Sequence, residues 1–109
     1  MARKGIDPKV KKVVHDYTEL LRRDRLPIRD VFVFGSRLTR RFRRDSDIDV
    51  AVVSPKFSSG FSANKYLLRK AHELPNGDFY IEPHGFHPST FQDENPLVWE
   101  IKKHGVKIE

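Results

Sequence analysis

The sequence has no cysteine, and among its 109 residues it has a single methionine and a single tryptophan. The lack of cysteine excludes disulfide bonds and thiolate metal ligands, which fits a cytoplasmic protein. No hydrophobic run approaches the roughly 18 residues of a membrane span. The basic start, MARKGIDPKVKK, is not followed by the apolar core of a signal peptide. We therefore expect a soluble, cytoplasmic protein without membrane contact.

The length and the hydrophobic pattern indicate the fold class. A chain of 109 residues can bury one modest core, so we expect a single domain over residues 1–109. Hydrophobic periodicity predicts helices over 8–23, over 61–74 and from Pro96 to about Gly105. Strands are predicted over 29–34, 47–54 and 78–82, with a further short strand close to residue 109, and Pro83 should end the third strand early because proline lacks a backbone donor. This order predicts an α/β fold, with helices covering a small mixed sheet.

The charge is strongly positive and unevenly placed. Lysine and arginine number 21 against 15 acidic residues, which gives a net charge of +6. Such a balance suits an anionic partner such as a nucleotide or nucleic acid, although solubility alone explains it equally well. The basic residues crowd between a Gly-Ser pair and two aspartates, as Arg37, Arg40, Arg41, Arg43 and Arg44.

Two aspartates stand one residue apart at the start of the second predicted strand. Residues i and i+2 of a strand point to the same side, so Asp47 and Asp49 present their carboxylates together. Two crowded acids need a nearby positive charge. Paired carboxylates on a rigid element are typical Mg²⁺ ligands beside substrate phosphates, but the arginines just upstream offer an equally simple counter-charge. The pair alone leaves both interpretations open.

A Gly-Ser pair precedes these acids by ten residues. Gly35 ends a strand and Ser36 opens the next segment, a junction that exposes backbone N–H groups to an anion. Glycine allows a phosphate to approach the backbone, and a serine hydroxyl can donate one more hydrogen bond. An ordinary turn would look the same. In combination with Asp47 and Asp49, however, the pair predicts a phosphate site next to a metal site.

The stretch FVFGSRLTRRFRRDSDIDVAVVS resembles the signature of the DNA polymerase β-like nucleotidyltransferase superfamily. Its Gly-Ser-Arg opening and Ser-Asp-Ile-Asp close are especially similar to the minimal nucleotidyltransferases that are paired with HEPN toxins in toxin–antitoxin systems. The first helix and the closing NPLVWEIKKHGVKIE extend the resemblance over nearly the whole chain. The resemblance implies an enzyme that moves a nucleoside monophosphate from a nucleoside triphosphate, expected to be ATP, to an acceptor hydroxyl with the help of two Mg²⁺ ions.

By the same resemblance, Asp47, Asp49 and a third carboxylate hold the metals, while Gly35, Ser36 and Arg37 hold the triphosphate. The third carboxylate is usually an aspartate on a neighbouring strand. Glu82 in FYIEPHGF occupies the corresponding place, and Asp78 is its competitor because both share a strand face. Glutamate departs from the pattern by one methylene, which puts activity in doubt at a site with strict octahedral geometry.

Three functions therefore stay open at this point. The first is Mg²⁺-dependent nucleotidyl transfer to a partner, expected to be a HEPN-type helical protein or a second copy of the chain. The others are a non-catalytic antitoxin of the same fold and a basic nucleic-acid-binding module. Two histidines near the third acid, His84 and His87, could contact phosphate or metal, but their spacing matches no common zinc pattern, and we interpret them as solvated or hydrogen-bonded.

Overall fold

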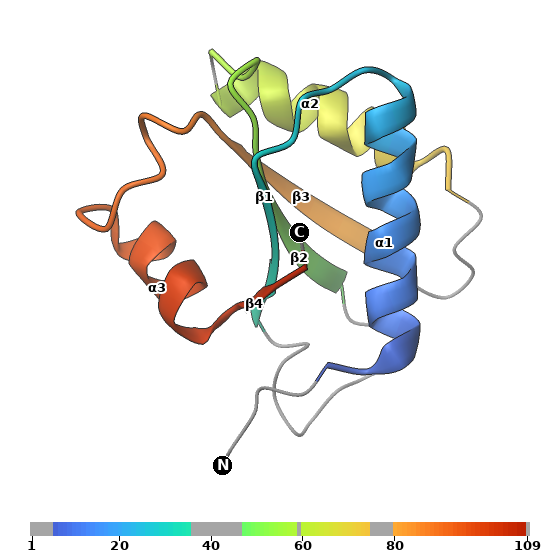
Figure 1. Ribbon diagram of the computed structural model, residues 1–109, viewed down its shortest axis with the longest axis horizontal. Helices are drawn as coiled ribbons and strands as arrows, with labels where there is room; N and C mark the ends of the chain where they lie inside the picture. Colours follow the sequence, from blue (N-terminus) through green and yellow to red (C-terminus); the bar gives the residue numbers. More distant parts are fainter. Residues whose placement is uncertain (1–5, 36–46, 59, 75–79, 109) are drawn as a thin grey trace.

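The structure is a computed structural model, and it describes residues 6–35, 47–58, 60–74 and 80–108 (Figure 1). These residues form a mixed α+β fold with a four-stranded sheet. The helices are α1 (Pro8–Arg23), α2 (Gly60–Ala71) and α3 (Pro96–His104), and the strands are β1 (Asp30–Phe34), β2 (Asp47–Val53), β3 (Tyr80–Phe86) and β4 (Val106–Lys107). The predicted fold class is confirmed. Among the described residues, no helix has the length and hydrophobicity needed to span a bilayer.

Two helices begin where capping residues predicted them. The side chain of Asp7 accepts a hydrogen bond from the backbone N–H of Lys9 at 2.8 Å, and Pro8 takes the first position of α1. Asn95 accepts from the N–H of Leu97 at 2.9 Å in front of α3. Both caps satisfy an N–H group that the first helical turn leaves without a partner, so the predicted starts are confirmed.

The sheet has the strand order β3-β2-β1-β4. β1 is antiparallel to β2 and to β4, whereas β2 and β3 are parallel. A parallel pair requires a crossover connection, and α2 lies in the segment between these two strands. The sheet is therefore mixed, and β3 forms one of its edges.

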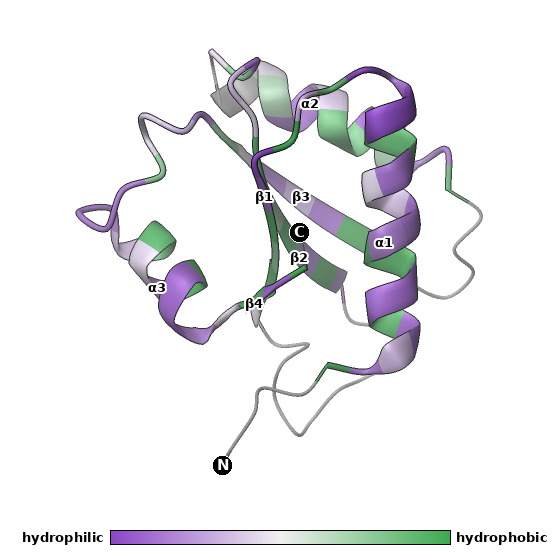
Figure 2. Ribbon diagram, in the orientation of Figure 1, coloured by the Kyte–Doolittle hydropathy of each residue, from purple (hydrophilic) through white to green (hydrophobic). Residues whose placement is uncertain are grey.

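Helices cover the two faces of the sheet unequally. α1 and α2 lie on one side, and α3 lies on the other (Figure 1). Hydrophobic and hydrophilic bands alternate along α1 (Figure 2), and its hydrophobic residues pack with those of α2 onto the sheet. The buried Tyr17 hydroxyl donates a 2.6 Å hydrogen bond to the carbonyl of Leu67, which ties the two helices together. A smaller cluster beneath α3 consists of Phe34, Ala51, Val53, Phe91, Val98 and Ile101.

Strand β3 is longer than predicted, because it continues through Pro83 to Phe86. The backbone carbonyl of Phe86 accepts a hydrogen bond from the N–H of Ser54, just after β2. Backbone groups alternate in direction along a strand, so residues 82, 84 and 86 direct theirs to β2. Residues 81, 83 and 85 direct theirs to the open edge. The N–H of Gly85 meets the side chain of Asn64 in α2 at 2.6 Å. The expectation that Pro83 ends the strand was wrong, since at this edge its missing N–H removes no bond to β2.

Candidate functional site

The candidate site lies on the α3 side of the sheet, at the starts of the parallel strands β2 and β3. Along β2, Ile48 and Val50 are buried in the core beneath α1 and α2, while Asp47 and Asp49 face the opposite side. Ala51 and Val53 share that opposite face but belong to the cluster beneath α3. One face of β2 thus changes from apolar to acidic where the packing against α3 ends.

The parallel register brings a second acid beside the first. Glu82 of β3 pairs directly with Asp49 of β2, and Asp47 pairs with Tyr80. His84 lies two residues after Glu82 and therefore on the same face. Its Nε2 is 3.3 Å from Oδ1 of Asp49 and 3.7 Å from Oε2 of Glu82. Asp49, Glu82 and His84 each offer one ligand atom, and these atoms lie within 4.8 Å of one another.

These three side chains differ in exposure. Glu82 is 54% exposed, whereas Asp49 and His84 are only 24% and 26% exposed. The His84 ring also packs against the ring of the buried Phe34, at 5.1 Å between centroids and a tilt of 58°. Asp49 and His84 form the sheltered part of the group, and Glu82 forms its open side.

Gly35, a predicted phosphate-binding residue, lies against the Asp49 carboxylate. Phe34 pairs with Asp49 across the antiparallel strands, so the next residue reaches the carboxylate itself. Gly35 has a φ of +87°, in the left-handed region that favours glycine, and a Cβ at this position would overlap Oδ2 of Asp49. The glycine is therefore required both by its backbone conformation and by the space that the carboxylate occupies. The end of β1 and the acids of β2 form one compact arrangement.

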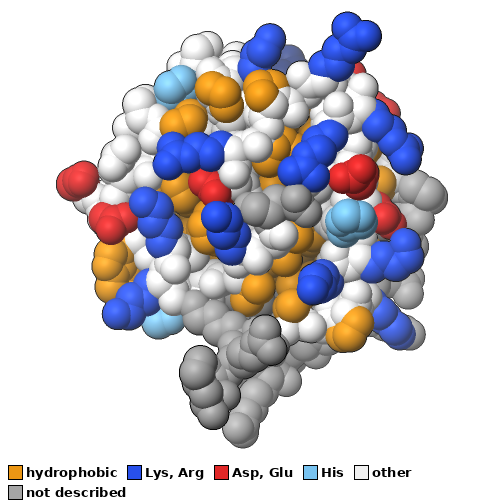
Figure 3. Space-filling view, viewed as in Figure 1, with side chains coloured by type: hydrophobic (Ala, Val, Ile, Leu, Met, Phe, Trp, Pro, Cys, Tyr) orange, Lys and Arg blue, Asp and Glu red, His pale blue; other side chains and the backbone are white. Residues whose placement is uncertain are grey.

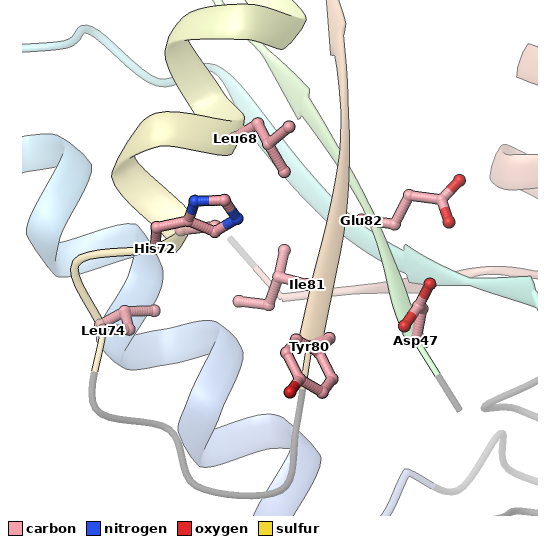
Figure 4. A pocket seen from close by; sticks show the side chains of 8 residues that line it. Asp47, Leu68, His72, Leu74, Tyr80, Ile81 and Glu82 are labelled. Carbon is pink, nitrogen blue, oxygen red and sulfur yellow. The ribbon is translucent and has the colours of Figure 1, made fainter. Parts of the chain in front are cut away.

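Asp47 lies one step nearer the strand starts, beside a groove of about 370 Å³ around the open edge of β3. Figure 4 shows the carboxylates of Asp47 and Glu82 on one side of β3, with His72 and other side chains of the α2 segment on the opposite side. Apolar residues make up much of the lining, namely Leu68, Ala71, Leu74 and Ile81. The groove thus passes around the edge of β3, with the acids on one side of the strand and the side chains of the α2 segment on the other.

Within the described ranges, no lysine or arginine pairs with the three acids Asp47, Asp49 and Glu82. The contacts of Asp49 and Glu82 are with the His84 ring. Lysine and arginine side chains are spread over the face shown in Figure 3, with acidic side chains among them, rather than gathered in one patch. Several residues singled out in the sequence lie outside the described residues: Ser36, Arg37, Arg40, Arg41, Arg43, Arg44 and Asp78.

His84 was interpreted from the sequence as a solvated or hydrogen-bonded residue rather than as a member of the site. It is hydrogen-bonded, as expected, but it belongs to a strand and its partner is Asp49. The available signal was its position two residues after Glu82, which puts both on one face if the strand continues. The wrong assumption about Pro83 concealed this signal. His87, in contrast, contacts the hydroxyl of Ser89 at 2.8 Å.

Comparison with known proteins identifies the family of the chain. A search of curated proteins gave no match. The nucleotidyltransferase domain family matches residues 15–105. This range includes β1, β2 and β3 and the site acids Asp47, Asp49 and Glu82. Because this match spans most of the chain and its site, the protein belongs to the nucleotidyltransferase domain family.

Proposed function

We propose that the protein is a metal-dependent nucleotidyltransferase that moves a nucleoside monophosphate from a triphosphate, with ATP as the expected donor, to an acceptor hydroxyl. The observation that carries this proposal is the position of the acids. Asp49 and Glu82 are level on parallel strands, and Gly35 leaves its Cβ space to the Asp49 carboxylate. This arrangement lies within a nucleotidyltransferase domain.

The residues present fit the proposed divalent ions. Asp47, Asp49 and Glu82 supply carboxylate oxygens, the ligands that Mg²⁺ prefers, from two hydrogen-bonded strands that hold them in place. The partial exposure of Glu82 leaves the group accessible to substrate. When bound, such ions neutralise phosphate charge and lower the pKa of an attacking hydroxyl.

The reaction is an exchange of one phosphorus–oxygen bond for another. The acceptor oxygen forms a bond to the α-phosphorus, the bond to the bridging oxygen breaks, and pyrophosphate leaves. The Glu82 carboxylate can accept the proton of the hydroxyl, since it forms the open side of the group. We assign the triphosphate to Gly35, Ser36 and Arg37, and the groove beside Asp47 and Glu82 to an organic part of a substrate.

We further propose that the acceptor is a hydroxyl of a partner protein of the HEPN type, expected to be a tyrosine, with the protein acting as an antitoxin. This part rests on the sequence resemblance. A second copy of the chain is the alternative partner. Arg40, Arg41 and Arg43 are the proposed contacts on this side, because an arginine cluster suits an acidic partner surface.

The decisive experiment is incubation of the protein with α-labelled nucleoside triphosphates, Mg²⁺ and a HEPN-type candidate acceptor. Label transferred to the acceptor, dependent on Mg²⁺ and lost in Asp49→Asn, would support the enzyme. Tight binding of the acceptor without transfer would favour the non-catalytic antitoxin. RNA binding that falls steeply with salt and needs no Mg²⁺ would favour the nucleic-acid module.

A further inference from the structure

We propose that the site has a nitrogen ligand, Nε2 of His84, and therefore binds Mn²⁺ in preference to Mg²⁺. This inference deepens the proposed function and depends on the same metal site. It concerns the group of Asp49, Glu82 and His84, in which a histidine accompanies the two acids.

The first support is the spacing of the three candidate ligand atoms. Nε2 of His84 is 3.3 Å from one carboxylate oxygen and 3.7 Å from the other. Ligand atoms about 2.1 Å from a shared ion lie roughly 3 Å apart when adjacent and about 4 Å apart when opposite. Both observed distances fall between these limits, and all three candidate ligand atoms lie within 4.8 Å of one another, so modest side-chain rotations would bring them onto one ion.

The second support is the way in which His84 is held. Its ring packs against Phe34, and its backbone pairs with Ala51 in the parallel ladder. Both neighbours are buried. A side chain fixed in this way keeps Nε2 turned to the carboxylates, and a fixed ligand loses little conformational freedom when an ion binds.

The chemistry of the donor set decides which ion is favoured. Mg²⁺ takes oxygen ligands and keeps much of its water. Imidazole nitrogen suits first-row transition metals such as Zn²⁺ and Ni²⁺ better than it suits Mg²⁺, and Mn²⁺ stands at the weak end of that series. Replacing one oxygen ligand by His84 therefore raises the affinity for Mn²⁺ relative to Mg²⁺. Mn²⁺ also retains the octahedral, oxygen-rich coordination that a triphosphate substrate requires.

The test is a titration of the complete protein with Mn²⁺ alone, followed by the loss of the free-ion EPR signal, and with Mg²⁺ as competitor. The main variant is His84→Gln, because its amide can still donate a hydrogen bond to Asp49 but offers a metal only oxygen. We expect the Mn²⁺ affinity to fall about tenfold or more. The loss of a residue that only supports a metal ligand already has an effect of that size, and His84 is proposed as a direct ligand. Mg²⁺ affinity should change far less. His84→Ala, checked for folding by circular dichroism, should show the same loss of Mn²⁺ preference.

His87→Gln is the matched control, since His87 contacts Ser89 rather than the acids. It should leave both affinities unchanged, and bound Mn²⁺ should broaden the imidazole NMR signals of His84 more than those of His87. Equal losses for both ions in His84→Gln, or no loss, would overturn the inference while leaving the proposed function intact. A wild-type protein that binds neither ion would overturn both.

Discussion

The contact between Gly35 and Asp49 predicts the result of a single added methyl group. In Gly35→Ala, the backbone of an alanine must adopt a left-handed conformation at a φ of +87°, which costs about 1–2 kcal/mol. The substitution also restricts the unfolded chain, which returns about 0.4–1 kcal/mol. From the backbone alone, we expect a net loss of about 1 kcal/mol in the free energy of unfolding.

The Asp49 carboxylate adds a second cost. The new Cβ would overlap Oδ2, so the carboxylate must rotate away and its 3.3 Å contact with His84 must change. A hydrogen bond to a charged group contributes about 1.5–3 kcal/mol when buried. Since Asp49 and His84 are about a quarter exposed, we expect about 1 kcal/mol here. The total loss is then about 2 kcal/mol.

A double-mutant cycle separates the two costs. In an Asp49→Ala background the overlap with Oδ2 no longer exists, so Gly35→Ala should cost only the backbone part, about 1 kcal/mol. Urea denaturation of the four proteins, without metal, measures the coupling between the two sites. Mn²⁺ or Mg²⁺ binding to Gly35→Ala should be weakened as well. A coupling near zero, or a Gly35→Ala protein more stable than wild type, would refute the proposed contact.

Three further predictions follow from the same geometry. Asp49→Asn should abolish transfer, and near-normal turnover would contradict the metal site. The amide oxygen can still accept the contact with His84, and the lost charge relieves repulsion between neighbouring acids, so melting curves without Mg²⁺ should show stability unchanged or raised by up to about 1 kcal/mol. Glu82→Gln should lower turnover by orders of magnitude while Asp78→Asn changes it little; the opposite result would make Asp78 the third acid. Tyr17→Phe should cost about 1 kcal/mol by removing the bond to Leu67. Because burial raises the pKa of Tyr17, stability should also fall above about pH 10, where the unfolded chain loses the phenol proton first, and the variant should show a smaller fall.

Most of the fold was predictable because it depends on local signals. The first helix was predicted with its observed bounds, since Asp7 and Pro8 mark its start and its apolar residues recur at helical spacing. The last helix likewise begins after its cap Asn95 and ends at His104, with Gly105 as its C-cap. The extent of β3 was not predictable in this way. Pro83 interrupts the strand only if its missing N–H faces a neighbouring strand. That depends on the strand order and on the pairing with β2, which no local pattern contains.

The site shows the same division between local and long-range information. The shared face of Asp47 and Asp49 follows from their spacing alone. The contact between Gly35 and Asp49 requires the antiparallel register of β1 and β2, and the approach of His84 requires the parallel register of β2 and β3. Register between distant segments is set by core packing across the whole sheet, which no local pattern contains.

Glu82 connects two different surroundings at the end of the sheet. With Asp49 and His84 it forms a group that combines oxygen and nitrogen ligands, and with Asp47 it lines the groove, where both acids offer only oxygen. If two ions bind as proposed, Asp47 and Asp49 hold both of them, and Glu82 ligates the one that activates the acceptor hydroxyl. The extra methylene that distinguishes Glu82 from aspartate carries its carboxylate farther from the strand, and the side chain is 54% exposed. Removing Glu82 or replacing His84 should then weaken the ion that both residues contact more than the other ion.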